Sequence, residues 1–581
     1  MTNAQIVTVL TEIANSLEIK GEIIFKVRAY YKAIDTISDL PEELSVIRAR
    51  GALSDLPGIG ASIAEKIEEL LDTGHCRYHE QLQAEFPPSM LELLRIPEVG
   101  PKTVKLLYDQ LGISSVDDLE AAAKAGKLHD VRGLGEKTEA NIIKGIAQMR
   151  QFGARFPLAR AYPMAQQILE ALRAAAPLDR IEAAGSLRRM KETIRDLDIV
   201  VTSEDPEAVM EAVVSLPRVR EVVLRGPTKT TILTDAGLQV DVRVVAPDEY
   251  GAALLYFTGS KEHNVKLRDL AVRRKLRINE YGIFQVGTNK LLGGATEAEI
   301  YEVMGMPWIP PELREDQGEI EAALQNRLPK LIELSDIRGD LHVHSKWSDG
   351  RAPIDTMVKE AVARGYDYLA ICDHSPMQVV ANGMSIERLR LRQRDIERAR
   401  KKYPQITLLA GSEVDIHADG HLDYPDEVLA ELDFVVASVH SGWKASSEAN
   451  TERILRAIAN PYVTVIGHPT GRLIGSRAPY EVDIEQVIRA AAAAGVALEI
   501  DASPERLDLK DTHARLAKEL GAKLIIDTDT HSPEGFDLIH FGVATARRAW
   551  LEASDVLNTL PRDQFLAALR KRPARKTKVP V

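Results

Sequence analysis

The pattern of hydrophobic and polar positions changes twice along the chain. Up to about residue 150, apolar residues recur at helical spacing. Between residues 155 and 245, short alternating runs such as LDIVVTS, TTILTD and LQVDVRVV predict strands. From about residue 337 onward, short apolar runs alternate with helical segments. The chain is therefore predicted to be a multidomain protein of mixed helix and sheet.

The third region repeats one theme seven times. Its apolar runs end in His, Asp or Glu, as in DLHVH, YLAICDH, ITLLAGSEVD, FVVASVH, VTVIGHP, VALEID and KLIIDTDTH. Strands that alternate with helices favour a parallel barrel, here a distorted (βα)7 barrel. Because the carboxyl ends of barrel strands meet at one face, we expect these polar side chains to converge there.

The first region repeats a Gly-hydrophobic-Gly turn three times, each time before an amphipathic stretch. The turns are LPGIG, IPEVG and VRGLG. One copy would be an ordinary helical corner, but three favour helix-hairpin-helix modules whose free N–H groups hold DNA phosphates. The candidate contacts are Gly58, Gly60, Gly100, Gly133 and Gly135, and position 98 of the second turn, Glu98, is left unassigned.

Composition excludes several classes of protein. The 581 residues are 45% hydrophobic and carry a net charge of −12, so bulk charge does not indicate a protein that coats nucleic acid. Two cysteines, Cys76 and Cys372, cannot build a disulfide framework. Neither a signal peptide nor a membrane-length apolar run is present, and a cytoplasmic location is expected.

Three acidic residues in the second region form a candidate metal site. Asp196 and Asp198 are two apart on a predicted strand and therefore share a face, and Asp241 lies on a later strand. A lone Asp-x-Asp is usually a solvated strand edge. Three converging carboxylates suit two Mg²⁺ or Mn²⁺ ions, which can activate a hydroxyl and stabilise a leaving pyrophosphate.

These carboxylates, with Gly185-Ser186 upstream and Tyr256-Phe-Thr-Gly-Ser260 downstream, resemble the family X DNA polymerases over residues 22–306. The resemblance implies that Asp196, Asp198 and Asp241 hold the catalytic metals. It also implies nucleotide contacts from Arg155, Gly185, Ser186, Arg189, Tyr256, Phe257, Gly259 and Asn264. Lys229 and Arg268 are the implied DNA contacts.

The resemblance also places Lys66 at the family's Schiff-base lysine, which implies lyase activity. Lys26 and Tyr30 match positions that hold a 5′-phosphate. Ser62 and Phe25 depart from the family's lysine and histidine, so an exposed helix lysine remains an equal interpretation of Lys66.

Nine residues at the strand ends of the third region have the types that bind transition metals. They are His342, His344, Asp349, His374, Glu413, His440, His468, Asp529 and His531. Imidazole with carboxylate suits Mn²⁺ or Zn²⁺, and nine ligands imply two or three ions. The set resembles the polymerase and histidinol phosphatase (PHP) superfamily, which implies 3′→5′ exonuclease, 3′-phosphatase and abasic-site endonuclease activity. Asp373 and Asp415 are expected to orient the imidazoles.

With these resemblances, the chain is divided as follows: a lyase-like helical domain over 1–85, a helix-hairpin-helix domain over 86–150, a nucleotidyltransferase palm over 151–245, a nucleotide-selecting thumb-like subdomain over 246–315, a linker over 316–336, a PHP domain over 337–570 and a basic tail over 571–581.

Three hypotheses of function follow. The first is a polymerase that fills short gaps in base excision repair or end joining, with an end-processing nuclease attached. The second is mainly a DNA 3′-end phosphoesterase whose polymerase half positions substrate. The third is a non-catalytic scaffold, which the complete ligand sets disfavour. The expected partners are gapped or nicked DNA and deoxynucleoside triphosphates, no membrane is expected, and the chain is expected to be a monomer.

Overall fold

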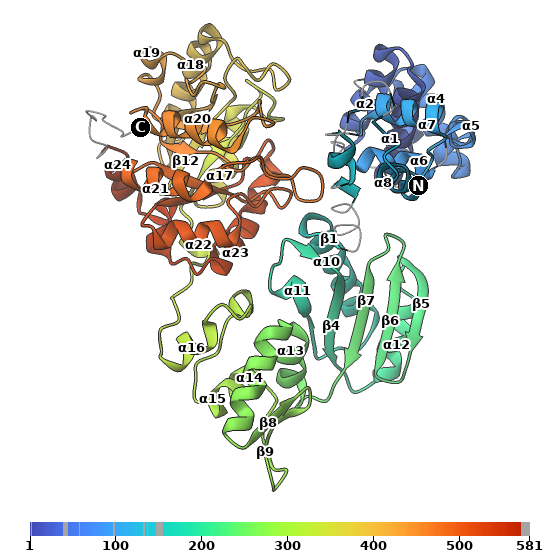
Figure 1. The fold of residues 1–581 in the computed structure, drawn as a ribbon, viewed down its shortest axis with the longest axis vertical. Coiled ribbons are helices and arrows are strands. Elements are labelled where there is room, and N and C mark those ends of the chain that lie inside the picture. The colour runs from blue at the N-terminus through green and yellow to red at the C-terminus, as the bar shows by residue number, and fades with distance from the viewer. Residues whose placement is uncertain are drawn as a thin grey trace. The chain divides into compact units, whose positions relative to one another are not determined.

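The computed structural model describes residues 1, 3–38, 44–56, 58–86, 88–96, 99–129, 131, 134–135, 138–143, 145–146 and 155–570. The chain forms two compact units, Met1–Ala154 and Arg155–Val581 (Figure 1). Gly133, Glu98 and the predicted basic tail over 571–581 lie outside the described residues.

The first unit is helical, as the apolar spacing predicted. Its elements are α1 (Asn3–Lys20), α2 (Ile24–Ser38), α3 (Leu44–Ala49), η1 (Leu53–Asp55), α4 (Ala61–Thr73), α5 (Arg77–Glu85), α6 (Pro88–Glu92), η2 (Leu93–Arg95), α7 (Pro101–Leu111) and α8 (Val116–Lys124). Gly60 and Gly100 are the N-caps of α4 and α7, and neither cap has a side-chain hydrogen bond. The first N–H groups of both helices are therefore available to a ligand.

The second unit begins with a palm built on a five-stranded sheet of order β2-β4-β7-β6-β5. Its strands are β2 (Arg180–Ala183), β4 (Asp196–Thr202), β5 (Val219–Arg225), β6 (Lys229–Thr234) and β7 (Gln239–Val244). The helices α10 (Leu158–Ala175) and α12 (Pro206–Val214) share one apolar core with the sheet. A short ribbon of β1 (Phe156–Pro157) and β3 (Thr193–Ile194) and the one-turn helix α11 (Gly185–Arg188) complete the palm.

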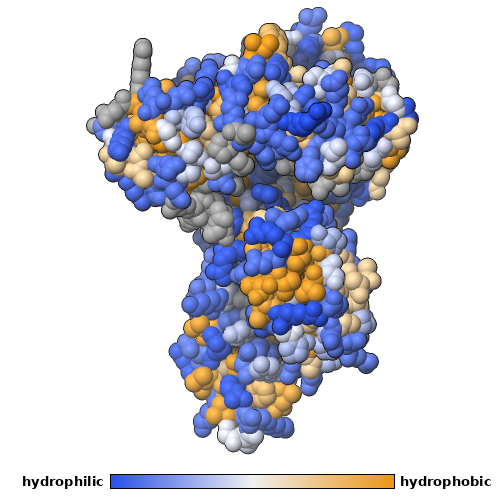
Figure 2. Space-filling model, turned by 90° about the vertical axis from the view of Figure 1, so that its right-hand side faces the viewer, coloured by the Kyte–Doolittle hydropathy of each residue, from blue (hydrophilic) through white to orange (hydrophobic). Residues whose placement is uncertain are grey.

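An edge strand of the palm sheet, β5, exposes apolar side chains between charged ones. On the face drawn in Figure 2, hydrophobic residues gather over the palm, and β5 exposes Val222, Val223 and Leu224. Arg220, Glu221 and Arg225 lie on the same strand. Charges along an open edge strand hinder pairing with another chain.

The thumb-like subdomain follows the palm. It contains α13 (Tyr250–Thr258), α14 (Lys261–Arg273), α15 (Glu297–Val303) and a sheet of β8 (Leu276–Asn279), β9 (Gly282–Gln285) and β10 (Leu291–Gly293). The stretch expected to be a linker, 316–336, is instead structured. It contains α16 (Glu319–Leu324) and η4 (Leu334–Asp336), and Ile320, Ala323 and Leu331 are buried in the core that α14 and α15 also line.

The third region forms the predicted barrel. Its parallel strands follow chain order: β11 (Gly339–Val343), β12 (Tyr368–Ile371), β13 (Thr407–Asp415), β14 (Phe434–Ser438), β15 (Val465–Ile466), β16 (Ala497–Asp501) and β17 (Leu524–Asp527). A bridge between Val343 and Thr530 joins the last strand region to the first. The barrel is therefore nearly closed.

Helices surround the barrel strands. They are α17 (Ile354–Ala363), α18 (Ile386–Lys402), α19 (Asp426–Leu429), α20 (Ser447–Ala459), α21 (Ile484–Ala494), α22 (Asp511–Glu519), α23 (Ile539–Arg548) and α24 (Arg562–Arg570). Over the described residues, no helix is both long and apolar enough to cross a bilayer.

The barrel and the palm pack against each other. Leu507 and Phe541 of the barrel are buried in the apolar core of the palm. The Phe541 ring meets the Tyr162 ring of α10 edge-on, with 5.1 Å between centroids. Arg472 of the barrel contacts Glu192 of the palm at 3.0 Å. These contacts explain why residues from Arg155 onward form one compact unit.

Candidate active sites in the palm and the barrel

The palm brings the three predicted aspartates to neighbouring strands. β4 and β7 run parallel, and their register pairs Asp198 with Asp241 and Asp196 with Gln239. Burial raises the pKa of Asp198 to about 7, and the charges of Asp196 and Asp241 add to the rise. Carboxylates crowded in this way favour the binding of a proton or a cation.

Asp241 is held by several donors. Thr231 Oγ1 donates at 2.5 Å and Gln239 Nε2 at 2.8 Å, while Lys229 Nζ lies 3.2 Å from the carboxylate. Burial alone would raise the pKa of Asp241, but these neighbours lower it. Lys229, expected to contact DNA, here pairs with the carboxylate of Asp241, because β6 and β7 are adjacent strands.

The Gly185-Ser186 turn lies beside the aspartates. Gly185 has φ of +62°, and a Cβ at this position would lie 2.8 Å from Asp198 Oδ2. A glycine is therefore required for the backbone to approach the carboxylate. Ser186 lies in the α11 turn that begins at Gly185. The candidate phosphate-binding turn and the acidic group are thus adjacent.

Two predicted phosphate-binding arginines have partners within the chain. Arg189 Nε contacts Glu315 at 3.0 Å, and its Nη1 donates to the Thr258 carbonyl. Arg155 donates to Thr193 Oγ1 at 2.8 Å and to the Thr193 carbonyl at 2.6 Å. These hydrogen bonds hold both guanidinium groups in place.

Three further predicted nucleotide contacts and the predicted DNA contact Arg268 lie on α13, its C-cap and α14. Tyr256 is 37% exposed, and Gly259 ends the helix with φ of +68°. Asn264 Nδ2 donates to the Tyr256 carbonyl at 2.7 Å, and Arg268 Nε donates to the Asn264 carbonyl at 3.2 Å. The four residues therefore lie along one continuous stretch of the thumb-like subdomain.

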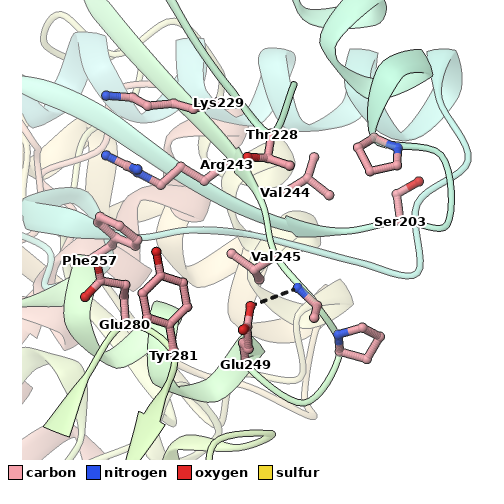
Figure 3. A pocket seen from close by; sticks show the side chains of 13 residues that line it. Ser203, Thr228, Lys229, Arg243, Val244, Val245, Glu249, Phe257, Glu280 and Tyr281 are labelled. Atoms are coloured by element: carbon pink, nitrogen blue, oxygen red, sulfur yellow. Dashed lines mark hydrogen bonds between the residues drawn. The ribbon is translucent and has the colours of Figure 1, made fainter. Parts of the chain in front are cut away.

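A pocket of about 500 Å³ is lined by residues that include Lys229, Arg243 and Phe257 (Figure 3). Lys229 and Arg243 extend from adjacent strands along its wall, and the Arg243 guanidinium lies 4.3 Å from the centroid of the Phe257 ring. Phe257, predicted as a nucleotide contact, here packs on a cation of the palm.

The candidate lyase lysine lies in the first unit. Lys66 Nζ donates to the Ser62 carbonyl at 2.8 Å and to Ser62 Oγ at 3.0 Å. It lies 4.8 Å from the centroid of the Tyr78 ring, and Lys26 Nζ lies 5.8 Å from the same centroid. The two lysines therefore face one aromatic ring.

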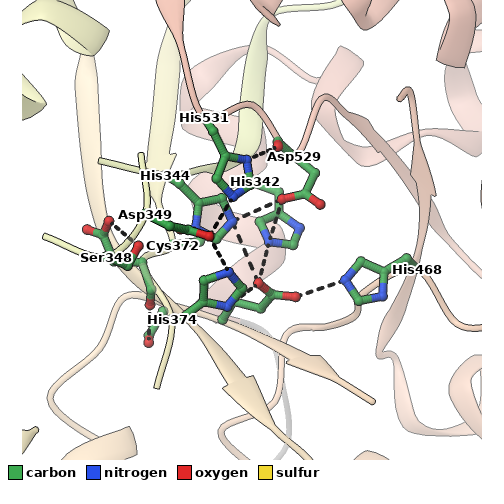
Figure 4. A network of polar contacts seen from close by, with 12 residues as sticks. His342, His344, Ser348, Asp349, Cys372, His374, His468, Asp529 and His531 are labelled. Carbon is green, nitrogen blue, oxygen red and sulfur yellow. Dashed lines mark hydrogen bonds and ion pairs between the residues drawn. The ribbon is translucent and has the colours of Figure 1, made fainter. Parts of the chain in front are cut away.

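All nine predicted barrel ligands converge. Figure 4 shows His342, His344, Asp349, His374, His468, Asp529 and His531 among them. Glu413 is central: its carboxylate lies 2.9 Å from His374 and His468, 3.1 Å from His440, 3.4 Å from His342 and 3.6 Å from His344. Burial opposes the charge of Glu413, but His440, His374 and His342 lower its pKa well below the usual range. The carboxylate can therefore bridge cations.

The other two carboxylates close the cluster on the opposite side. Asp529 lies 3.0 Å from His344 and 3.6 Å from His342. Asp349 lies 3.3 Å from His531, 3.5 Å from His374 and 3.7 Å from His344. Among the described residues, the groups whose potential ligand atoms all lie within 4.8 Å of one another are all in the barrel.

The cluster fits metal ions. Among the described residues, seven buried atoms of the cluster have no hydrogen-bond partner: His342 Nε2, His344 Nδ1, His344 Nε2, His374 Nδ1, Glu413 Oε2, His468 Nδ1 and Asp529 Oδ1. Buried polar atoms without partners are costly, and converging imidazole and carboxylate atoms of this kind are suited to transition metals. His468 and Asp529 also have positive φ, of 24° and 47°. Such backbone strain is typical of functional sites.

Surrounding residues orient the imidazoles, in part as expected. Asp415 lies 3.2 Å from His440 Nδ1, but Asp373 bonds Ser345, Ser348 and Arg392 rather than an imidazole. The sequence interpretation missed Glu499, which lies 2.6 Å from His342 Nδ1, and Asp527, which joins the same buried group. The signal was available, since VALEID ends in alternating acidic residues like the other strands.

Comparison with known proteins adds the following. Family models match residues 1–76 as a helix-hairpin-helix domain, 90–148 as a SAM-like helix-hairpin-helix tandem, 253–315 as a DNA polymerase beta thumb and 340–503 as a PHP domain. "DNA polymerase/3'-5' exonuclease PolX" of Bacillus subtilis (strain 168) is 39% identical over 560 residues, which are 96% of this chain and 97% of that protein. The chain belongs to the PolX family.

Two further relatives match parts of this PolX-family chain. DNA polymerase lambda of Rattus norvegicus is 26% identical over 54% of the chain and 56% of its own length. "Probable phosphatase Teth514_1060" of Thermoanaerobacter sp. (strain X514) is 33% identical over 38% of the chain and 89% of its own length. The two kinds of module are thus also found in separate proteins.

Proposed function

We propose that this chain is a gap-filling DNA repair polymerase of family X whose barrel is a 3′→5′ exonuclease that also processes 3′ ends. The observation that carries the polymerase activity is the register that pairs Asp198 with Asp241 beside the Gly185 turn. The nuclease rests on the nine converging ligands. Gapped or nicked DNA and deoxynucleoside triphosphates are the proposed substrates.

In the palm, Asp196, Asp198 and Asp241 would hold Mg²⁺ or Mn²⁺. When bound, two such ions acidify the primer 3′-hydroxyl and neutralise the departing pyrophosphate. The N–H groups at the start of α11 and the Ser186 hydroxyl would contact triphosphate oxygens. Tyr256, half-exposed next to Gly259, would contact the sugar. Arg189 would exchange Glu315 for the nucleotide as it binds.

In the barrel, the nine ligands would hold two or three Mn²⁺ or Zn²⁺ ions. When bound, such ions lower the pKa of a water molecule, so that hydroxide is available at neutral pH, and they neutralise the charge of a phosphodiester. Asp415 and Glu499 keep the His440 and His342 rings in position through their Nδ1 atoms. Glu413, which contacts five imidazoles, would be the carboxylate ligand at the centre of the group.

Two variants separate the two activities. The assay uses a gapped duplex and all four deoxynucleoside triphosphates, with Mg²⁺ and Mn²⁺ tested separately. Asp198→Asn should abolish primer extension, whereas removal of nucleotides from the 3′ end should continue. His344→Ala should abolish removal of nucleotides from the 3′ end, whereas primer extension should continue. If Asp198→Asn extends primers normally, the chain is mainly a 3′-end phosphoesterase and the polymerase proposal fails. If His344→Ala still degrades 3′ ends, the nuclease lies elsewhere.

The first unit would position DNA by its backbone, through the N–H groups at Gly60 and Gly100 and the equivalent turn at Gly135. Affinity for DNA should then fall steeply with salt. Lyase activity of Lys66, the cytoplasmic location and the monomeric state remain predictions.

A further inference from the structure

The barrel centre contains many acidic groups, whereas the substrate proposed for it is a polyanion. Beneath the nine ligands lie further buried acids, among them Glu499, Asp501 and Asp527. Cations that face the centre are therefore needed to receive DNA. Arg506, on the loop after β16, is such a cation. Its Nε lies 3.3 Å from Asp501 and 3.9 Å from the ligand Asp529.

The Arg506 guanidinium has nitrogen atoms that are free to bind a further ligand. In the described part of the chain, neither of its terminal nitrogens has a hydrogen-bond partner, and its side chain keeps 20% of its surface exposed. An arginine fork with two unused N–H groups matches two oxygens of a phosphodiester. The next residue, Leu507, has φ of 44°, so the loop is strained directly after Arg506, as is common at functional sites.

A second arginine lies close by. The Arg477 guanidinium is 4.1 Å from the centroid of the Trp443 ring, and its Nε donates to the Gly471 carbonyl at 2.8 Å. Burial and the charge of Arg506 both lower the pKa of Arg477, which reflects two cations held near each other. Trp443 Nε1 donates at 3.2 Å to the carbonyl of Val439, which directly precedes the ligand His440, so the stack is attached to the segment that carries this ligand. An arginine on an aromatic ring is a common surface for single-stranded nucleic acid.

Both arginine loops are fixed by the palm. Arg472 lies at their junction: it contacts Glu192 of the palm at 3.0 Å and donates to the Leu507 carbonyl. Ile474 N donates to the Glu505 carbonyl at 2.6 Å, which ties the two loops together. Leu507 is buried in the palm core. The palm therefore determines where the two arginines lie.

We propose that Arg506 and Arg477 form the DNA-binding side of the barrel centre, with Arg506 on the scissile phosphate and Arg477–Trp443 on the adjoining nucleotide, and that the palm residue Glu192 positions them through Arg472. The inference rests on the proposed nuclease function. It assigns the polymerase palm a second task, which is to support the nuclease substrate site.

The first experiment uses the full chain with Mn²⁺ and two substrates, thymidine 5′-(4-nitrophenyl) phosphate and a 3′-labelled single-stranded oligonucleotide. Arg506→Gln should lower kcat/KM on both substrates by about 10- to 100-fold, the effect of losing charged hydrogen bonds. Arg477→Gln should lower it on the oligonucleotide only, mainly through KM. Arg489→Gln is the matched control, since Arg489 is an exposed barrel arginine paired with Glu485.

Arg506→Gln also removes an ion pair with a ligand, so bound Mn²⁺ is measured for every variant. Arg506→Lys keeps a charge near Asp501 and Asp529 but lacks the fork, and should show an intermediate loss at full Mn²⁺ occupancy. If saturating Mn²⁺ restores either variant to the wild-type rate, Arg506 serves the metals and the proposal is overturned.

Glu192→Gln tests the contribution of the palm. It should raise the KM of the oligonucleotide several-fold, with bound Mn²⁺ and primer extension unchanged. An unchanged KM would overturn the positioning role. Binding of a fluorescent tetranucleotide is measured in parallel, because binding does not require hydrolysis. If the wild type does not hydrolyse 3′ ends, the proposed nuclease function fails. In that case, weaker tetranucleotide binding by Arg506→Gln and Arg477→Gln would still support the DNA-binding role of the two arginines. Unchanged binding would reject that role.

Discussion

At the scale of single residues, the palm site depends on the absence of a side chain. Gly185 lies so close to Asp198 that a methyl group would displace the carboxylate. The same carboxylate carries a raised pKa because it is buried and faces two other acids. A shift of its oxygens would therefore disturb both the geometry of the site and the charge that a metal compensates.

We predict that Gly185→Ala lowers primer extension at least 10-fold while 3′-end hydrolysis stays unchanged. The added Cβ would lie 2.8 Å from Asp198 Oδ2 at a φ of +62°, and a misplaced catalytic group is costly. Gly287→Ala is the control: it has φ of +95° and open space around its Cβ. Equal losses in the two variants would indicate strain alone.

Glu499 gives a residue-scale prediction for the barrel. Glu499→Gln should weaken activation of the nuclease by Mn²⁺ about 10- to 100-fold, because the carboxylate at 2.6 Å fixes the His342 ring. Mn²⁺ titration of 3′-end hydrolysis measures the effect, with primer extension as the internal control. Unchanged half-saturation would show that His342 does not depend on Glu499.

The sequence identified the candidate metal ligands, but it did not show which other side chains lie next to them in space. Alternation along strands predicted that Asp196 and Asp198 share a face, and the apolar runs contain every candidate barrel ligand except Asp349. The pairing of Lys229 with Asp241 and of Arg189 with Glu315 was not predictable, because it depends on which strands and loops become adjacent in space. Glu499 was missed because no candidate was taken from the VALEID strand, which contains no histidine.

At the scale of elements, a buried ion triad joins the palm to the thumb-like subdomain. Glu297, at the start of α15, contacts Arg188 of α11 at 2.7 Å and Arg314 at 2.6 Å. Trp308 Nε1 donates to the same carboxylate at 2.9 Å. Burial of Ile309, Leu313 and Ile320, together with the charge of Arg314, folds the stretch before and into the expected linker against the core of the thumb-like subdomain.

Glu297→Gln should destabilise the protein by roughly 3–5 kcal/mol at neutral pH, since Arg314 would be left buried with one partner fewer. Burial alone would raise the pKa of Glu297, but Arg314 and Arg188 lower it to about 2. Its ionised form thus stabilises the fold above the unfolded pKa of 4.5, and this contribution is lost as pH falls from about 4.5 through about 2.

Urea unfolding of wild type and Glu297→Gln at pH 7 and pH 3 tests this sign. The difference between the two proteins should shrink at pH 3 by about 2 kcal/mol. A difference that grows on acidification would mean that the triad does not hold Glu297 as a carboxylate.

At the scale of the whole molecule, the palm and the barrel share a core. The barrel was predicted as a separate domain over 337–570, yet Phe541 and Leu507 pack inside the palm core. Local periodicity cannot reveal this, because an apolar residue on α23 has the same pattern whichever neighbour covers it. The division between units after Ala154, by contrast, lies close to the boundary at 150 that the change of pattern predicted.

Phe541→Ala should therefore loosen the palm as well as the barrel. Removing the ring leaves a cavity next to Tyr162 and costs about 3–5 kcal/mol, and hydrogen exchange should accelerate in both α10 and α23. Phe536→Ala is the matched control, because Phe536 is fully buried within the barrel alone and packs near Tyr366. It should accelerate exchange around α17 and leave α10 unchanged. If hydrogen exchange in α10 is also unchanged in Phe541→Ala, the stability of the palm does not depend on this contact with the barrel. The coupling between the palm and the nuclease site would then have to come from Arg472 and Glu192 alone.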